Sequence, residues 1–377
     1  MKIAYVATLP IPSTTANTVH VMKMAQALAH NGHDVSVFCP RHPDTPIPAN
    51  TAEIYAQYGV AQNFKFRPLK VNPGRVGLFL FALLVAKNAR AENTNLVFSR
   101  CLVSAWICAL QGLPVLYEKH SSFDGQDTLT KNIFKFLSNH KNYKGLVVIS
   151  QALKDHLIER FGLPENSVIV AADGADPLSD TPAPAPFDKS PGSFHAGYIG
   201  HLYKGRGIDV IASAAQKLPD ITFHIVGGNP GDVAQWKTQL AGYTNIIFYG
   251  HVAHADTIQF LKNFDVLLAP YQRKVTVLSE KLDTAAWMSP LKIFEYMSSG
   301  VPMIASDLQI LHEVLEDRKN AYLCDPENAD KWALTLRHIR TNPGEARQIA
   351  AAAREDLLSR YTWRKRAENI MTAIKAL

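Results

Sequence analysis

The stretch SPLKIFEYMSSGVPMIASD, at residues 289–307, combines a helical pattern with a short apolar run. Ser289 and Pro290 suit the N-cap and the first helical position, so we expect a helix to start there. The turn that follows leads into VPMIAS, a run of the length of a buried strand, and the pattern stops at Ser306–Asp307. The stretch therefore predicts one helix–strand unit of an α/β fold.

Short apolar segments alternate with helical segments on both sides of this stretch. One series runs from KIAYVAT at 2–8 to SVIVAADGAD at 167–176, and a second from FHAGYIG at 194–200 to NAYLCD at 320–325. The segment between them is rich in proline and poor in apolar residues, which is typical of a linker. We expect two doubly wound domains, 1–176 and 194–359, with a linker at 177–193. A last helix, 360–377, caps the second domain or returns to the first.

Composition favours a globular protein of the reduced cytosol. Hydrophobic residues make up 47% of the 377 residues, which excludes a disordered or fibrous chain. The four cysteines lack zinc or redox spacing. MKIAYVAT reads as a strand rather than a signal peptide. The longest apolar run, at residues 76–86, is shorter than the roughly 20 residues of a membrane span. The expected localisation is cytoplasmic.

The net charge of +6 is concentrated between residues 61 and 100. A basic segment beside an apolar helix suits an anionic membrane surface or an anionic substrate. The alternative is a solvated face beside a core helix. The segment carries one acidic residue, Glu92, against seven cations: Lys65, Arg67, Lys70, Arg75, Lys87, Arg90 and Arg100.

The turn GHLYKGRGID, at residues 200–209, has the composition of a phosphate site. Glycines allow close backbone approach, and cations stand just before a predicted helix N-terminus. The spacing is not that of a P-loop, and G-x-G-x-x-G is absent after the first strand, which argues against a nicotinamide dehydrogenase. An ordinary turn with surface cations is the alternative. The turn's residues are Gly200, His201, Lys204, Gly205, Arg206 and Gly207.

Lys292 and Glu295 give the opening stretch its chemistry. The lysine and the free N–H groups at the helix start suit an anion, and the carboxylate suits a diol such as a ribose. The alternative is a surface pair three residues apart on one helix, worth about 0.2–0.5 kcal/mol.

The first series offers fewer polar candidates. His120 follows the strand LPVLYEKH and is either a cleft group or a packed core histidine. The loop 8–21 belongs to the ligand edge of such a sheet, with Asn17 or Thr18 as the N-cap of the next helix. D-x-D, H-E-x-x-H and clustered His/Cys sets are absent, so we expect no metal. G-x-S-x-G is also absent, which argues against acyl hydrolysis.

Taken in order, these motifs resemble the retaining glycosyltransferases of family four. The similarity includes YEKH, VVISQALKDHL, GHLYKGRGID, IVGG, FYGHV, SPLKIFEYMSSGVPMIASD and HEVLEDRKNAYL, and it covers nearly the whole chain. It implies the GT-B fold, two facing Rossmann-like domains with a cleft between them. It also implies a nucleotide-sugar donor held mainly by the second domain, with no further cofactor.

The resemblance implies a role for individual residues. The family's G-R-L-x-x-x-K-G pattern falls on residues 200–207, so His201 and Arg206 would face the diphosphate. Glu295 would bind the ribose, and His120 would lie near the reacting sugar. The implied catalytic residues are His120, Arg206 and Glu295. The implied donor-binding residues are Asn17, Gly200, His201, Lys204, Arg206, His251, Val252, Ser289, Pro290, Leu291, Lys292 and Glu295.

One position departs from the family pattern. Many members carry E-x(7)-E, and the earlier glutamate contacts the transferred sugar, but that position here is Trp287. Asp283 or Glu280 could replace it from the preceding loop. The identity of the donor sugar is therefore left open.

The expected function is transfer of a hexose from a nucleoside diphosphate sugar, UDP rather than GDP, with retention of configuration. The acceptor is a glycan, a lipid or a small molecule, with a membrane-borne cell-envelope glycan favoured by residues 61–100. That would place the protein on the inner face of the cytoplasmic membrane, and no nucleic-acid partner is expected. The alternatives are a nucleotide-sugar 2-epimerase on the same fold and a non-catalytic nucleotide-sugar binding protein.

Overall fold

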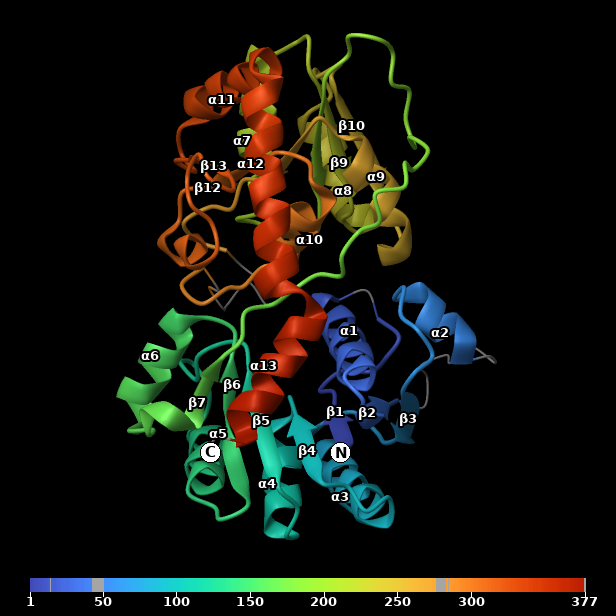
Figure 1. The fold of residues 1–377 in the computed structure, drawn as a ribbon, viewed down its shortest axis with the longest axis vertical. Coiled ribbons are helices and arrows are strands. Elements are labelled where there is room, and N and C mark those ends of the chain that lie inside the picture. The colour runs from blue at the N-terminus through green and yellow to red at the C-terminus, as the bar shows by residue number, and fades with distance from the viewer. Residues whose placement is uncertain (14, 43–50, 276–282, 284, 376–377) are drawn as a thin grey trace. The chain divides into compact units, whose positions relative to one another are not determined.

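The structure is a computed structural model that describes residues 1–13, 15–42, 51–275, 283 and 285–375. The chain forms two compact units (Figure 1). Unit 1 comprises Met1–Asp173 and Trp363–Leu377, and unit 2 comprises Gly174–Thr362. The chain therefore leaves unit 1 after Asp173 and returns to it at Trp363.

Unit 1 is built on a parallel sheet. Among the described residues seven strands pair in the order β3-β2-β1-β4-β5-β6-β7. The order reverses between β1 and β4, and loops at the carboxyl ends of such neighbours form the usual ligand site. The strands are β1 (Lys2–Val6), β2 (Asp34–Arg41), β3 (Lys65–Lys70), β4 (Leu96–Ser99), β5 (Val115–Lys119), β6 (Tyr143–Val148) and β7 (Val168–Val170).

Helices connect these strands. Helix α3 is strongly apolar, but none of the helices in the described part of the chain is long and apolar enough to cross a membrane. The helices of unit 1 are α1 (Ala16–His30), α2 (Thr51–Gln57), α3 (Arg75–Ala91), α4 (Leu102–Leu110), α5 (Thr128–Ser138), α6 (Gln151–Phe161) and α13 (Trp363–Lys375).

Strand β3 lies inside the basic segment, where the sequence analysis expects no strand. It pairs only with β2 and so occupies the edge of the sheet. Its sequence KFRPLK contains a proline and several cations, which suit an edge strand but weaken the apolar pattern by which strands are recognised. Half-exposure of this edge is the physical reason that the pattern misses it.

Unit 2 repeats the architecture with a smaller sheet. Six strands of the described chain pair in the order β10-β9-β8-β11-β12-β13, and the order reverses between β8 and β11. The strands are β8 (His195–Ile199), β9 (Thr222–Val226), β10 (Ile246–Gly250), β11 (Val266–Ala269), β12 (Met303–Ser306) and β13 (Tyr322–Cys324). The helices are α7 (Ile208–Lys217), α8 (Pro230–Gln239), α9 (Thr257–Asn263), α10 (Leu291–Ser299), α11 (Ala329–Thr341) and α12 (Pro343–Asp356).

The C-terminal helix α13 belongs to unit 1, where it packs beside α1 (Figure 1). It begins at Trp363, after a π-helical turn at Leu357–Tyr361. Trp363, Ile370 and Met371 are buried on one face of α13, which is the face expected of an amphipathic helix on a core. For residues 360–377 we expected either a cap on the second domain or a return to the first domain. The described helix returns to the first domain.

A buried histidine pair lies beneath the proline-rich segment in unit 2. His195 Nδ1 and His224 Nε2 are 2.9 Å apart, and His224 Nδ1 is 2.8 Å from the Tyr249 hydroxyl. The Phe187 ring, from the expected linker, packs on both imidazoles with centroids 4.9 and 4.3 Å away. Residues near Phe187 therefore cover part of unit 2. Burial lowers the pKa of both histidines, that of His224 to about 3.

This pair should make unit 2 sensitive to acid. An unfolded histidine has a pKa of about 6.5, so between about pH 6.5 and 3 the unfolded chain binds a proton that folded His224 does not. The free energy of unfolding should therefore fall as the pH falls through this window. His224→Phe should cost about 1–3 kcal/mol at neutral pH through lost hydrogen bonds, yet lose less stability on acidification.

Urea unfolding at neutral pH and near pH 5 measures both effects. His30→Phe, at an exposed position of unit 1, is the control and should behave like the wild type. An equal loss of stability on acidification in wild type and His224→Phe would show that His224 is not the source of the acid sensitivity.

Candidate functional site

The β8–α7 turn of unit 2 has a backbone that only glycine allows. Gly205 and Gly207 have φ angles of 87° and 80°, where other residues are strained. A Cβ on Gly205 would lie 2.1 Å from the Lys274 carbonyl oxygen, and one on Gly207 would lie 1.8 Å from that of Pro270. The turn therefore lies directly against segment 270–275, and α7 begins at its end with free N–H groups.

A buried lysine meets this turn from α10. The Lys292 side chain is 9% exposed, and its Nζ lies 3.7 Å from the ring centroid of Tyr198 and 5.1 Å from that of Tyr271. Within the described chain Nζ has no hydrogen-bond partner. A Cβ on Gly200 would lie only 2.8 Å from Nζ, so the turn and the lysine are in contact.

A second cation shares this environment. The Arg206 guanidinium lies over the Tyr271 ring at 5.4 Å, and its buried Nε lacks a hydrogen-bond partner among the described residues. Burial, and next the charge of Arg206, hold the pKa of Lys292 well below its usual range, against the opposing effect of Glu295. Burying cations without a bound anion is costly. The arrangement is therefore a candidate anion site, in which a bound anion would offset this cost.

The alternative of a Lys292–Glu295 surface pair is wrong. Lys292 is buried, and in the described residues its ammonium forms no ion pair with a carboxylate. Glu295 is half-buried one turn further along α10, and its Oε1 lies 3.6 Å from Nδ1 of His254. His254 follows FYGHVA and was not singled out from the sequence, because only the fold brings its turn beside α10.

The remaining residues of the turns surround this cation pair. His201 is half-buried and stacks on Tyr203 with centroids 4.8 Å apart. Burial, followed by the charges of Arg206 and Lys292, lowers the pKa of His201 to about 4, so its ring is neutral. Lys204 is exposed on the same turn. After β10, His251 is exposed and Val252 is half-buried.

Helix α10 starts one residue later than the sequence predicts. Pro290 has φ −75° and ψ 122°, so it is the N-cap, and Leu291 is the first helical residue. The expectation that Ser289 caps the helix is therefore wrong. The reason is that the extended ψ of Pro290 places it outside the helix, and a proline can stand there because an N-cap N–H is not needed within the helix.

The sugar-facing carboxylate expected by the family pattern has no clear substitute. Trp287 is half-buried. The Oδ1 atom of Asp283 accepts hydrogen bonds from the backbone N–H groups of Val275 and Ala285, both at 3.0 Å. Asp283 is thus engaged with backbone N–H groups, and Glu280 lies outside the described residues.

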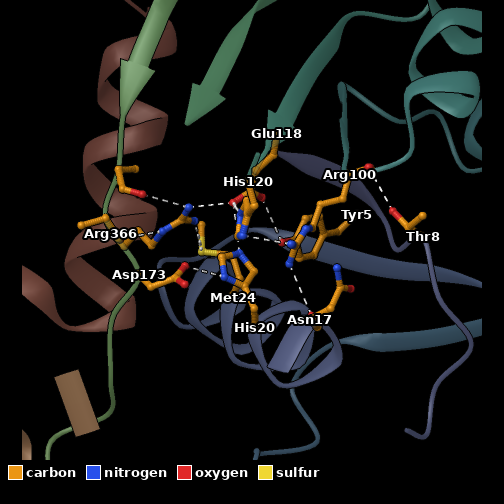
Figure 2. Close-up of polar contacts among 12 residues, drawn as sticks. Tyr5, Thr8, Asn17, His20, Met24, Arg100, Glu118, His120, Asp173 and Arg366 are labelled. Carbon is orange, nitrogen blue, oxygen red and sulfur yellow. Dashed lines mark hydrogen bonds and ion pairs between the residues drawn. The ribbon is translucent and has the colours of Figure 1, made fainter. Parts of the chain in front are cut away.

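The second set of predicted residues lies at the carboxyl edge of the unit 1 sheet. Figure 2 shows His120, just after β5, in a group of polar side chains. Arg100, which follows β4, places Nη2 3.1 Å from Nδ1 of His120 and Nη1 3.4 Å from the backbone oxygen of Asn17. Nε2 of His120 is 2.8 Å from Oε1 of Glu118. The structure therefore brings Asn17 and His120 together through Arg100, which the sequence analysis counted only as charge.

The partners of His120 determine its tautomer. A guanidinium can only donate, so Nδ1 accepts from Arg100 and the proton lies on Nε2, which donates to Glu118. Burial, and next the charge of Arg100, lower the pKa of His120 to about 3, so the ring is neutral. With both nitrogens engaged, His120 is neither a packed apolar residue nor a free proton carrier.

Asn17 and Thr18 are not N-caps, contrary to the expectation. Helix α1 begins at Ala16 with Thr15 as its N-cap, so both residues lie in the first turn. The reason is that Thr15 already has the extended conformation of a cap, φ −85° and ψ 145°. Oδ1 of Asn17 is buried without a partner in the described chain, which leaves an acceptor for a ligand.

Three side chains of this group have the residue types of a metal site. His20, His120 and Asp173 bring donor atoms within 4.8 Å of one another. However, Nδ1 of His20 is 2.8 Å from Asp173, and both nitrogens of His120 are engaged. The guanidinium groups of Arg100 and Arg366 also adjoin the group. These contacts fit a hydrogen-bond network better than a cation site.

Two family models match most of the chain. The one described as Glycosyltransferase Family 4 matches residues 18–177, and the one described as Glycosyl transferase-like matches residues 208–372. The chain is 23% identical over 368 residues to a phosphatidyl-myo-inositol mannosyltransferase of Mycobacterium leprae. That match covers 93% of this chain and 90% of the relative.

Solved structures share the fold. A glycosyltransferase from Rickettsia africae superposes with a TM-score of 0.73 at 15% identity, over 100% of this chain and 98% of that one. HepE from Anabaena, determined in complex with UDP, has a TM-score of 0.72 at 17% identity over 100% of both chains. The likeness, together with the two parallel sheets, confirms the α/β GT-B fold that the sequence predicts.

Pyrophosphate should bind the anion site of unit 2 in a pH-dependent way. An anion favours the protonated form of Lys292, so affinity should be highest below the lowered pKa and decline as the pH rises through it. Lys292→Arg keeps its charge at every pH and should remove this contribution. Lys292→Met should weaken binding roughly ten- to hundredfold.

Isothermal titration calorimetry between about pH 6 and about pH 10 measures these affinities. The ionisation of pyrophosphate itself is common to all variants, so the difference between wild type and Lys292→Arg isolates Lys292. The same pH dependence of pyrophosphate affinity in wild type and Lys292→Arg would show that Lys292 is not its source.

Proposed function

We propose that this chain, which belongs to the family 4 glycosyltransferases, transfers a hexose from a nucleoside diphosphate sugar to an acceptor hydroxyl. We further propose that UDP is the nucleotide, that the anomeric configuration is retained and that the acceptor is a membrane-borne glycan or lipid. The bond between the sugar's anomeric carbon and the diphosphate oxygen breaks, and the acceptor oxygen forms the new bond at the same carbon.

The observation that carries the proposal is Lys292, which is buried beside Arg206 and has no hydrogen-bond partner among the described residues. Their charges would meet the diphosphate as it takes up negative charge on leaving, and preorganised charge in a buried site is a strong source of catalysis. Lys204 and the backbone N–H of Leu291 at the start of α10 would add to this stabilisation, whereas Pro290, which has no N–H, would only border the diphosphate. Since protein cations supply it, the proposed reaction does not require a metal ion.

The rest of the donor would be held by the neighbouring turns. Glu295 would accept hydrogen bonds from the ribose hydroxyls, with His254 beside its carboxylate. His251 and Val252 would border the base, and Gly200 would admit the phosphates close to the backbone. The UDP bound by HepE of Anabaena supports the choice of nucleotide.

Unit 1 would supply the residues around the reacting sugar. Asn17 offers a buried free acceptor within the described chain, and His120 a ring fixed by its neighbours. We assign His120 to contact with the sugar rather than to proton transfer, because both of its nitrogens are engaged.

The acceptor side of the proposal depends on exposed apolar side chains more than on charge. Lys65, Arg67 and Arg75 form ion pairs with Asp34, Glu92 and Asp127, at 2.9, 3.3 and 3.3 Å, so part of the basic excess is locally neutralised.

Two helices of unit 1 carry the apolar groups. Val76, Phe79 and Leu80 of α3 are exposed, as are Leu129 and Phe136 of α5. The Arg75–Asp127 pair links the starts of these helices. Apolar side chains interspersed with cations suit the surface of an anionic bilayer, and the mannosyltransferase of M. leprae is named for a lipid acceptor.

A non-catalytic nucleotide-sugar binding protein is the alternative that one observation favours. Trp287 stands where the family has a sugar-contacting glutamate, and Asp283 is engaged with backbone N–H groups. Such a protein would bind donor and yield no product with any acceptor. A 2-epimerase would instead release a new sugar without an acceptor, so product analysis separates the three.

A panel of UDP, GDP and ADP without added metal tests the donor site. We expect UDP to raise the melting temperature, because a ligand that binds the native state stabilises it. Lys292→Met should lose the shift. A shift with GDP alone would correct the nucleotide, and a panel with no shift in the wild type would contradict the proposed function.

Glu295→Ala should raise the donor KM and lower kcat/KM about ten- to hundredfold, since it removes the charged acceptor of hydrogen bonds that the ribose hydroxyls donate. Steady-state kinetics of sugar transfer provide the measurement. Glu355→Ala, at an exposed position of α12, is the matched control. Kinetics of Glu295→Ala equal to those of the control would remove the ribose assignment.

Vesicle sedimentation tests the membrane contact. Phe79→Ser combined with Leu80→Ser should reduce binding to vesicles that contain anionic lipid, because the variant loses apolar area that would enter the bilayer. Leu334→Ser, at an exposed apolar position of unit 2, should bind as the wild type does. Absence of wild-type binding at low salt would eliminate the contact.

A further inference from the structure

The carboxylate of Glu118 is the centre of the group in Figure 2. Its side chain is fully buried. Its Oε1 lies 2.7 Å from Nη2 of Arg366, 2.8 Å from Nε2 of His120 and 3.1 Å from Nε2 of His20. Oε2 accepts a hydrogen bond from the Tyr5 hydroxyl at 3.3 Å. One buried oxygen therefore connects His120 to the C-terminal helix.

Arg366 is held as firmly as the carboxylate that it contacts. Its side chain is 2% exposed. Nε donates to the carbonyl oxygen of Ala172 at 3.0 Å, and Nη2 donates to that of Ala171 at 3.2 Å as well as to Glu118. The guanidinium fork thus joins α13, the end of β5 and the chain after β7 from two separate nitrogens, a geometry that the single nitrogen of a lysine lacks.

Arg366 also controls charge in the group. Burial raises the pKa of Glu118, but the positive charge of Arg366, followed by the contributions of His20 and His120, holds it well below its usual range. Asp173 faces the same group through His20, and its pKa is likewise lowered by His20 against the effect of burial. Without Arg366, the carboxylates would draw a proton onto an adjacent imidazole.

We propose that Arg366 is a positioning residue for His120: through Glu118 it fixes the ring of His120 in the neutral Nε2–H form, with Nδ1 turned to Arg100. Glu118 and His120 stand between Arg366 and any substrate that His120 contacts. Only the activity readout of this inference rests on the proposed function, because the tautomer of His120 is measurable in the free protein.

A purely structural ion pair is the competing explanation. Removing one partner of a buried pair leaves an uncompensated charge and destabilises a protein strongly, whereas replacing both partners by apolar groups is often tolerated. A variant that lacks both Glu118 and Arg366 therefore separates the two roles. It should fold, yet offer no acceptor for Nε2–H of His120.

The variants are Arg366→Met, the double variant Glu118→Met with Arg366→Met, and Arg364→Met as a control on the exposed face of α13. Nitrogen-15 spectra of the imidazoles report tautomer and charge, with His120 assigned by its absence in His120→Gln. In the wild type and in Arg364→Met we expect one neutral Nε2–H form of His120 from about pH 5.5 to about pH 8.5.

Arg366→Met should lower the melting temperature and bring protonated imidazole into this pH range. The double variant should regain most of the melting temperature but show a mixture of His120 tautomers. In transfer assays both should lose kcat about tenfold or more, with a smaller change in donor KM.

An unchanged His120 spectrum in the double variant would overturn the inference and leave Arg366 a structural role alone. If the wild type shows the Nε2–H form and the variants lose it, the inference stands even when no sugar transfer is found. In that case the proposed function is contradicted, whereas the positioning role of Arg366 is not.

Discussion

A buried carboxylate needs a positive partner, and the Glu118–Arg366 ion pair meets this need in unit 1. Desolvating an isolated carboxylate costs several kcal/mol, so the burial of Glu118 near the end of β5 depends on the guanidinium that α13 supplies. Arg366 also fixes the chain after β7, through hydrogen bonds to the carbonyl oxygens of Ala171 and Ala172. Much of the ligand edge of this sheet therefore depends on one contact from the end of the chain.

Unit 2 handles buried charge in the opposite way. Within its described part, Lys292 and Arg206 lie over aromatic rings, and neither Lys292 Nζ nor Arg206 Nε has a hydrogen-bond partner. The cost of this arrangement is recovered only when an anion binds, so stability is exchanged for affinity at this site. The two units thus share a fold but use buried charge differently: one network is closed, and the other is completed by ligand.

The sequence predicts most of the fold because apolar periodicity reports burial. Strands buried on both faces, such as β8 and β11, are visible as short apolar runs, and the family assignment and fold class are confirmed by the comparisons. Edge strand β3 escapes detection because its exposed side carries cations. The starts of α1 and α10 are each misplaced, since a cap depends on a local ψ angle that residue type only biases.

For the candidate sites, residues that share a turn were found together, and residues that meet only through tertiary folding were not. The glycines and cations of 200–207 carry a local signal. Arg100, His254 and Arg366 carry none, because their partners lie far away in the sequence.

The return of the chain to unit 1 at Trp363 has a consequence for biosynthesis. Unit 2 is one continuous segment, whereas Glu118 and Arg366 are 248 residues apart. At translation rates of about 5–20 residues per second, roughly 10 to 50 s pass between the synthesis of the two. During that interval Glu118 lacks its guanidinium partner, and the carbonyl oxygens of Ala171 and Ala172 lack the hydrogen bonds that Arg366 donates. The segment made first is therefore completed last, after the segment made second has had time to fold.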